Sequence, residues 1–261
     1  MNRFLKLRSS TLVVFSSLLI GTLAFAESKK EPTQTFPLQA GGYLSLENIN
    51  GDVTIEGWKK NEVSISAVKN GTSKDLDRIK IVVEVDKYEG KDWIHIETEY
   101  GESRGGFLNS LKSAGSIDYT IKAPSDAILE DIELVNGSLK VAGITGYLSL
   151  GTVNGSITAT GMAGNAWVET VNGNLDLSFD KMSDGQSVDL ESVNGAIVLR
   201  IPAKANAKVG AETLNGNISS EFGLTVEKGQ WVGSSMEGLV GSGGARITLE
   251  TVNGSIDVKK R

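Results

Sequence analysis

The chain has 261 residues, no cysteine, and 26 basic against 32 acidic side chains, which gives a net charge of −6. The lack of cysteine excludes a disulfide, a thiolate metal site and a cysteine-linked lipid anchor. The acidic balance argues against nucleic acid or anionic lipid as a partner, because both require a basic face. The 31 glycines against 4 prolines favour many short strands joined by glycine turns.

Residues 1–26 have the pattern of a secretory signal peptide. Arg3, Lys6 and Arg8 form a positive start, an apolar stretch covers 11–23, and Ala24-Phe25-Ala26 is a cleavage site of the small-x-small type. The apolar stretch is short for a bilayer span of about 20 residues, so a retained anchor is the alternative. Cleavage would leave 23 basic and 32 acidic residues, a net charge of −9. We expect a periplasmic, secreted or cell-surface protein with no integral membrane span after cleavage.

The next segment, 27–36, is expected to be a flexible linker that leads into an N-terminal β region over 37–125. Within this region four alternating stretches predict strands, at 62–69, 78–86, 91–99 and 116–122. They do not follow the repeat described below, so we expect an irregular β cap, either an antiparallel sheet or widened coils. Such a cap is needed because an open solenoid end is a sheet edge that would pair with another chain. A loop is expected over 102–115.

A tripeptide of an aliphatic residue, asparagine and glycine then recurs along the chain. It appears first at Ile49-Asn50-Gly51 and then forms an array over 126–261, with a period of about 18 to 22 residues. We expect its asparagines and glycines to be structural turn residues: Asn136, Gly137, Asn154, Gly155, Asn172, Gly173, Asn194, Gly195, Asn215, Gly216, Asn253 and Gly254. The last gap, of 38 residues, predicts one degenerate turn near 227–239, with a flexible stretch over 233–244.

Each tripeptide is flanked by two alternating strands whose buried positions have opposite parity. The apolar residues stand five and three positions before the aliphatic residue, and four and six positions after it. A straight strand cannot change parity and keep one core, so the chain must bend at Asn-Gly, two residues that tolerate positive φ. This predicts an all-β fold, a parallel β-solenoid or β-helix of stacked turns that is continuous with 37–125 as one domain. Asn-Gly between alternating strands also fits a stack of antiparallel hairpins, which is the competing fold.

The chain resembles a bacterial family of unknown function called the putative-adhesin domains. The likeness includes the segment from Leu44 to Trp58, the segment from Ile117 to Pro124, and the whole Val-Asn-Gly array. The resemblance implies a β-solenoid and an adhesin-like role. It implies no catalytic residue, because fold analogy alone does not give activity.

A glutamate recurs two positions before the aliphatic residue, on the outward face. Stacked strands lie about 4.8 Å apart, so neighbouring carboxylates would repel by roughly 0.9 kcal/mol in water. We interpret the column as a solvated ladder, and a Ca²⁺ site as its alternative. The candidate metal ligands are therefore Glu169, Glu191, Glu212 and Glu250.

Other candidates for chemistry are few. His95, the single histidine, lies on the outward side of a strand and is expected to be an exposed residue without a metal. Trp58, Trp167 and Trp231 are candidate glycan platforms, although scattered tryptophans usually pack against the protein. We expect no catalytic residue and no cofactor.

These observations predict an exported, non-enzymatic, adhesin-like binding or scaffold protein of the cell envelope. Its partner would be an envelope or host glycan or protein. One alternative is a carbohydrate-active β-helix enzyme, a lyase or glycosidase, which needs clustered carboxylates in one cleft. Another alternative is an envelope-stress accessory protein, which the sequence alone does not distinguish from a binding or scaffold protein.

Overall fold

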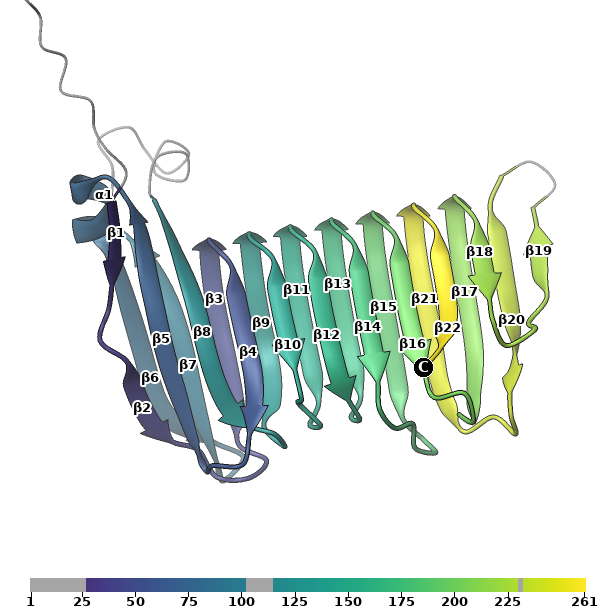
Figure 1. The fold of residues 1–261 in the computed structure, drawn as a ribbon, viewed down its shortest axis with the longest axis horizontal. Coiled ribbons are helices and arrows are strands. Elements are labelled where there is room, and N and C mark those ends of the chain that lie inside the picture. Colours follow the sequence, from purple (N-terminus) through teal and green to yellow (C-terminus); the bar gives the residue numbers. More distant parts are fainter. Residues whose placement is uncertain (1–26, 102–114, 230–231) are drawn as a thin grey trace, which may run out of the picture.

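The computed structural model describes residues 27–101, 115–229 and 232–261, which form an elongated stack of strands in two 11-stranded sheets (Figure 1). The signal-peptide pattern at 1–26, the loop at 102–114 and Trp231 lie outside the described residues. Sheet I contains β1 (Glu27–Lys30), β2 (Gln34–Pro37), β4 (Val53–Trp58), β5 (Glu62–Gly71), β8 (Ser116–Pro124), β10 (Leu139–Ala142), β12 (Ile157–Met162), β14 (Leu175–Phe179), β16 (Ile197–Ile201), β18 (Ile218–Ser220) and β22 (Ile256–Lys260).

Sheet II contains the other strands, and one short helix, α1 (Ser73–Arg78), joins the two sheets near the N-terminal end. Its strands are β3 (Tyr43–Asn50), β6 (Ile79–Tyr88), β7 (Lys91–Tyr100), β9 (Ile128–Asn136), β11 (Leu148–Asn154), β13 (Ala166–Asn172), β15 (Ser187–Asn194), β17 (Ala207–Asn215), β19 (Val226–Lys228), β20 (Ser234–Val240) and β21 (Ala245–Asn253). Among the described residues, no helix is both long enough and apolar enough to cross a membrane.

Each coil of the array is one strand of sheet II, a bend at Asn-Gly, and one strand of sheet I. Successive coils pair in parallel and in register, so that Leu150 lies opposite Val168 and Asn154 opposite Asn172. The residues predicted to be buried on either side of the bend, such as Val168 and Leu177, have no exposed surface. The parallel β-solenoid is therefore confirmed, and the hairpin stack is wrong for the array.

The N-terminal part is an irregular β cap, as predicted. β5 pairs antiparallel with β8 in sheet I, and β6 pairs antiparallel with β7 in sheet II. The expectation of a flexible linker at 27–36 is wrong, because β1 and β2 both pair antiparallel with β5. Backbone hydrogen bonding to the free edge of β5 orders a segment whose side chains bury little apolar surface.

The C-terminal part differs from the sequence prediction in its strands and in the spatial order of its coils. The 38-residue gap is not a degenerate coil: β19 and β20 are antiparallel strands, and β20 covers the outer edge of β17. The stretch 233–244 is largely the strand β20, with Met236 and Val240 buried. The last coil, β21 and β22, returns and inserts between β15–β16 and β17–β18 (Figure 1). It inserts there because β20 already occupies the other side of β17, while all coils share one register.

Candidate binding groove

The bend of every coil is held by a ladder of asparagine side chains. Asn154 donates its Nδ2 to Asn136 Oδ1 at 2.9 Å, and Asn172 donates to Asn154 in the same way. The ladder runs unbroken through the motif asparagines in the spatial order Asn50, Asn136, Asn154, Asn172, Asn194, Asn253 and Asn215. Each side chain therefore contributes a hydrogen bond between coils at the corner of the solenoid.

The motif glycines are required by stacking and not by their φ angle. Among the seven motif glycines only Gly51 has a positive φ, at 120°, and the six of the array do not: Gly137, Gly155, Gly173, Gly195, Gly216 and Gly254. A Cβ atom at Gly155 would overlap the carbonyl group of Gly137 in the neighbouring coil, and a Cβ at Gly173 would overlap that of Gly155. The prediction that Asn-Gly bends the chain through positive φ is therefore wrong. The bend brings coil backbones too close together for a side chain.

A column of buried hydroxyl groups supports the same corner, and it was not among the features expected from the sequence. Thr170 Oγ1 donates to the carbonyl oxygen of Gly155 at 3.0 Å, and the same bond recurs between neighbouring coils. The donors are the residues that precede the aliphatic position, namely Thr152, Thr170, Ser192, Thr213 and Thr251. Their recurrence as Thr or Ser on the buried face was the available signal, because a buried hydroxyl needs a partner.

The aliphatic residues of the tripeptide form an exposed column on the outer face of sheet II. Their side chains are 39% to 53% exposed, although most aliphatic residues in strands of this array are buried. The column is Val135, Val153, Val171, Val193, Val252 and Leu214, in spatial order. An aligned row of exposed aliphatic side chains is a contiguous apolar patch, which on a protein surface is typical of a binding site.

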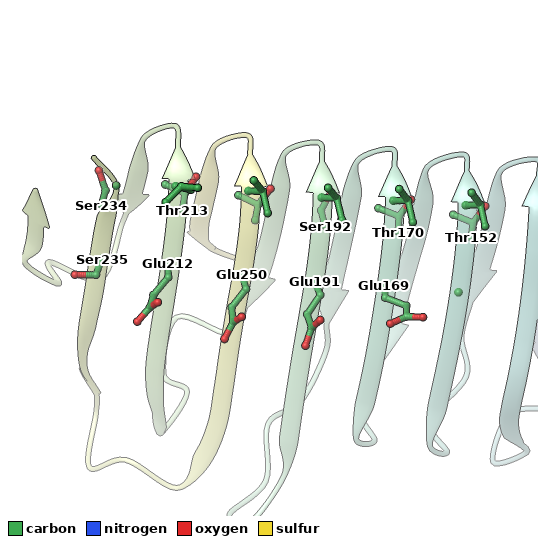
Figure 2. Close-up of a pocket in the computed structure, with 18 of the residues that line it drawn as sticks. Thr152, Glu169, Thr170, Glu191, Ser192, Glu212, Thr213, Ser234, Ser235 and Glu250 are labelled. Carbon is green, nitrogen blue, oxygen red and sulfur yellow. The ribbon is translucent and has the colours of Figure 1, made fainter. Parts of the chain in front are cut away.

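The glutamate column runs beside this apolar column, two residues away along each strand. Glu191 lies opposite Glu169 on one side and opposite Glu250 on the other, and Glu250 lies opposite Glu212. Gly151 interrupts the column between Glu133 and Glu169. Figure 2 shows that the Glu169 carboxylate points away from Glu191 and toward the coil on its other side, which carries Thr152. The side chain of Glu169 lies 3.8 Å from where a Cβ of Gly151 would be.

The two columns, apart from Val135, line a groove of about 840 Å³ that crosses several coils (Figure 2). Val232, Gly233 and Ser234 also line the groove, at the C-terminal end of the stack. No Lys or Arg of the described chain forms an ion pair with the groove glutamates, since the ion pairs of the described residues all lie elsewhere. The groove therefore combines an apolar wall with carboxylates that have no cationic partner in the described residues.

The electrostatics of the column are clearest at Glu133. Partial burial raises the pKa of the Glu133 carboxyl, and the negative charges of Asp131, Glu47 and Glu169 raise it further. Within the described residues no three His, Asp or Glu side chains are placed to hold a metal ion. The candidate ligands Glu169, Glu191, Glu212 and Glu250 thus stand in a row but do not converge on one point.

The remaining sequence candidates lie outside the groove. His95 Nδ1 lies 2.9 Å from Ser45 Oγ. The imidazole ring of His95 stacks on the ring of Trp93, with 5.5 Å between the ring centroids. Trp58 is half-buried in sheet I, where its Nε1 donates to the Glu62 carbonyl at 2.8 Å. Trp167 lies on the outer face of sheet II and is 43% exposed, but it does not line the groove.

Comparison with known proteins identifies the family. A family model described as Toastrack DUF4097 matches residues 40–259, which is most of the chain. The chain belongs to the Toastrack DUF4097 family. This agrees with the resemblance to putative-adhesin domains and with the two stacked sheets, and the family's function is unknown.

Two solved structures illustrate what this Toastrack protein is similar to. The putative cell adhesion protein of Clostridium sporogenes matches 90% of this chain and 100% of its own, at 14% identity and a TM-score of 0.56. A putative adhesin of Bacteroides fragilis matches 88% of this chain and 97% of its own, at 11% identity and a TM-score of 0.43. The first likeness supports the fold alone. No curated protein matches the sequence significantly.

Proposed function

We propose that this Toastrack protein is an exported, non-enzymatic binding or scaffold protein of the cell envelope, and that its partner occupies the groove on sheet II. The observation that carries the proposal is the exposed column from Val135 to Leu214. The stack has a continuous core between its sheets, yet it repeats an aliphatic residue at the outward position two residues after the glutamate. A repeated apolar position on the solvent face has no role in the core, so it points to a partner.

The chemistry of the groove favours a protein partner over a glycan. Aliphatic side chains bury well against the apolar side chains of a polypeptide, and the free carboxylates would attract Lys or Arg beside them. A glycan site would be expected to present aromatic platforms, but none of the described residues that line the groove is aromatic, and Trp167 stands outside it. The name of the Clostridium sporogenes protein, a putative cell adhesion protein, agrees with a binding role. The signal-peptide pattern at 1–26 supports export.

The arrangement of the carboxylates gives the enzyme alternative little support. Hydrolysis of a glycosidic bond generally uses two carboxyl groups that flank the bond from opposite sides. Here Glu191, Glu250 and Glu212 stand side by side in one column of one sheet (Figure 2). Turnover on a panel of polysaccharides that is lost in Glu191→Gln would contradict the proposal and favour an enzyme.

The binding proposal is tested by capture from envelope extract, with the mature protein as bait. We expect the native protein to retain a protein partner, and a Val171→Lys/Val193→Lys variant to lose it, because two ammonium groups would stand on the apolar wall. Val198→Lys, on the outer face of sheet I, is the matched control and should retain the partner. Equal capture by all three proteins would show that the groove is not the binding surface, and recovery of glycan alone would refute the protein partner.

A further inference from the structure

The four ends of the two sheets are protected very unequally. Sheet I ends in β1 and β2, of four residues each, at one end and in the three-residue β18 at the other. Sheet II ends in the three-residue β19 at the C-terminal end. At its N-terminal end it finishes in β6, a strand of ten residues with no proline. Short edge strands and prolines discourage pairing with another chain, and β6 has neither.

One face of β6 is an apolar strip that the described residues cover only in part. β6 pairs with β7 so that Ile81, Val83 and Val85 lie opposite residues whose side chains are buried, which places all three on the inner face of sheet II. Ile81 and Val83 pack partly against the core, whereas Val85 is 54% exposed. The inner row of β6 is therefore partly buried at Ile81 and Val83 and exposed to solvent at Val85.

The outer row of β6 carries charges of both signs without ion-pair partners. Lys80 and Glu84 are exposed, and neither forms an ion pair within the described residues. They flank Val82 at two residues on either side. A strand with this pattern can pair with itself in antiparallel orientation, because a two-fold axis at Val82 brings Lys80 of each copy opposite Glu84 of the other.

We propose that a second copy of this chain docks on the edge of β6, so that two sheets II join into one continuous sheet through residues 79–85. In this register Val82 meets Val82, Lys80 meets Glu84, Ile81 meets Val83 and Ile79 meets Val85. Every apolar residue of the inner row meets another apolar residue, and Val85 is covered. The backbone groups on the side of β6 that pairs with no strand in the described part of the chain gain hydrogen-bond partners, as in other cases of strand addition.

Other registers match less well. A shift by one residue would set the inner apolar row against the outer charged row. Centring the axis on Val83 would place Val82 opposite Glu84, and centring it on Ile81 would place Lys80 opposite Val82. The Val82 register is the one among these that satisfies both rows.

The dimer has a consequence for binding that does not depend on the identity of a partner. A two-fold axis perpendicular to sheet II leaves the outer faces of both copies on the same side. The two grooves would then face the same surface, and a dimer could hold two sites of one partner or surface at once, which raises the overall affinity through effective concentration. The groove extends from β9 across the stack to β17 and β20, away from β6, so dimerisation and groove binding can be measured separately.

The experiment measures the mass of the mature protein in solution by sedimentation and light scattering over a wide range of concentration. The native protein is expected to pass from monomer to dimer as concentration rises. Lys80→Glu sets glutamate against Glu84 twice across the axis, and should raise the dissociation constant about tenfold or more. The Lys80→Glu/Glu84→Lys variant exchanges the two charges and should restore the dimer. Lys228→Glu, the same change on the edge strand β19, is the control and should leave the dimer unchanged.

Three outcomes would overturn the proposal. A native protein that stays monomeric at every concentration has no self-pairing edge, and β6 would then be free for a different chain. A dimer that tolerates Lys80→Glu forms through another surface. A charge-exchanged variant that remains monomeric while its circular dichroism and melting temperature match those of the native protein excludes the Val82 register.

Discussion

Gly195 lies directly over Gly173, so closely that a Cβ atom on Gly195 would overlap the carbonyl group of Gly173. The two glycines belong to neighbouring coils, and Asn194 and Asn172 beside them share one rung of the asparagine ladder. The neighbouring backbone is fixed in place on both sides, because each coil is hydrogen-bonded to the next in both sheets. The corner of the solenoid is thus the place where coil spacing is least adaptable.

Gly195→Ala is therefore expected to destabilise the protein by about 3 kcal/mol, because backbone atoms must move to admit the methyl group. Chemical denaturation followed by circular dichroism measures the change. Gly151→Ala is the matched control, since the nearest atom to its Cβ is a Glu169 side-chain oxygen at 3.8 Å and its φ is not positive. The control should change the free energy of unfolding by less than about 1 kcal/mol. Equal losses in the two variants would refute the stacking argument.

The hydroxyl column gives a second prediction at the same corner. Thr170 is buried and donates to the Gly155 carbonyl, so Thr170→Val leaves a carbonyl oxygen without its partner while the shape of the side chain is kept. We expect a loss of about 1–3 kcal/mol in the free energy of unfolding. The exposed Thr160 on β12 is the control, and Thr160→Val should change stability by no more than about 0.5 kcal/mol. A Thr170→Val variant as stable as the native protein would show that water replaces the hydroxyl.

The sequence predicts the coil correctly because its signal is local. Period-2 alternation and the parity change at Asn-Gly are properties of about one coil, and each is repeated several times. The reason for the glycine was not available, since overlap with the next coil depends on how closely two distant segments stack. The sequence did reveal the exposed position of Glu191, but not that Val193 and its equivalents form an apolar wall beside it.

The order of the coils could not be predicted for a related reason. Leu249 fits equally well beside Leu190 or Ala211, because every coil presents the same buried pattern at the same register. What decides the order is β20, which pairs antiparallel with β17 and closes that edge. The antiparallel strands between 226 and 240 carry no Asn-Gly motif, so in the sequence this segment is visible only as a long gap between two motifs.

The inserted coil gives a third prediction. Leu249 has no exposed surface and lies between β15 and β17, so Leu249→Ala should cost about 2–5 kcal/mol. Hydrogen exchange should show weaker protection in both β15 and β17, because the cavity lies between them. Leu239→Ala is the control, as this side chain is 60% exposed. Loss of protection in β17 and β20 with none in β15 would contradict the insertion of the last coil.

The raised pKa of Glu133 gives the last prediction, on the dependence of stability on pH. Burial and the charges of Asp131, Glu47 and Glu169 raise this pKa in the folded protein above its value of 4.5 in the unfolded chain. The ionised carboxylate is therefore less favourable in the folded state. This cost is fully present above the folded pKa and disappears below the unfolded pKa. Glu133→Gln should therefore stabilise the protein at neutral pH and raise its melting temperature. The gain in the free energy of unfolding should stay below about 1 kcal/mol, because water screens the charges of the column.

A control of opposite sign is available at the other end of the stack. Lys208 donates to Glu237 and lowers the pKa of that carboxyl, so the Glu237 charge stabilises the folded state above the unfolded pKa, and this contribution is lost as pH falls through the folded pKa. Glu237→Gln should therefore lower the melting temperature at neutral pH. Both differences from the native protein should fade in acid, since all three proteins then carry a neutral group there. If Glu133→Gln instead lost stability at neutral pH, the repulsion along the glutamate column would have to be offset by a bound cation.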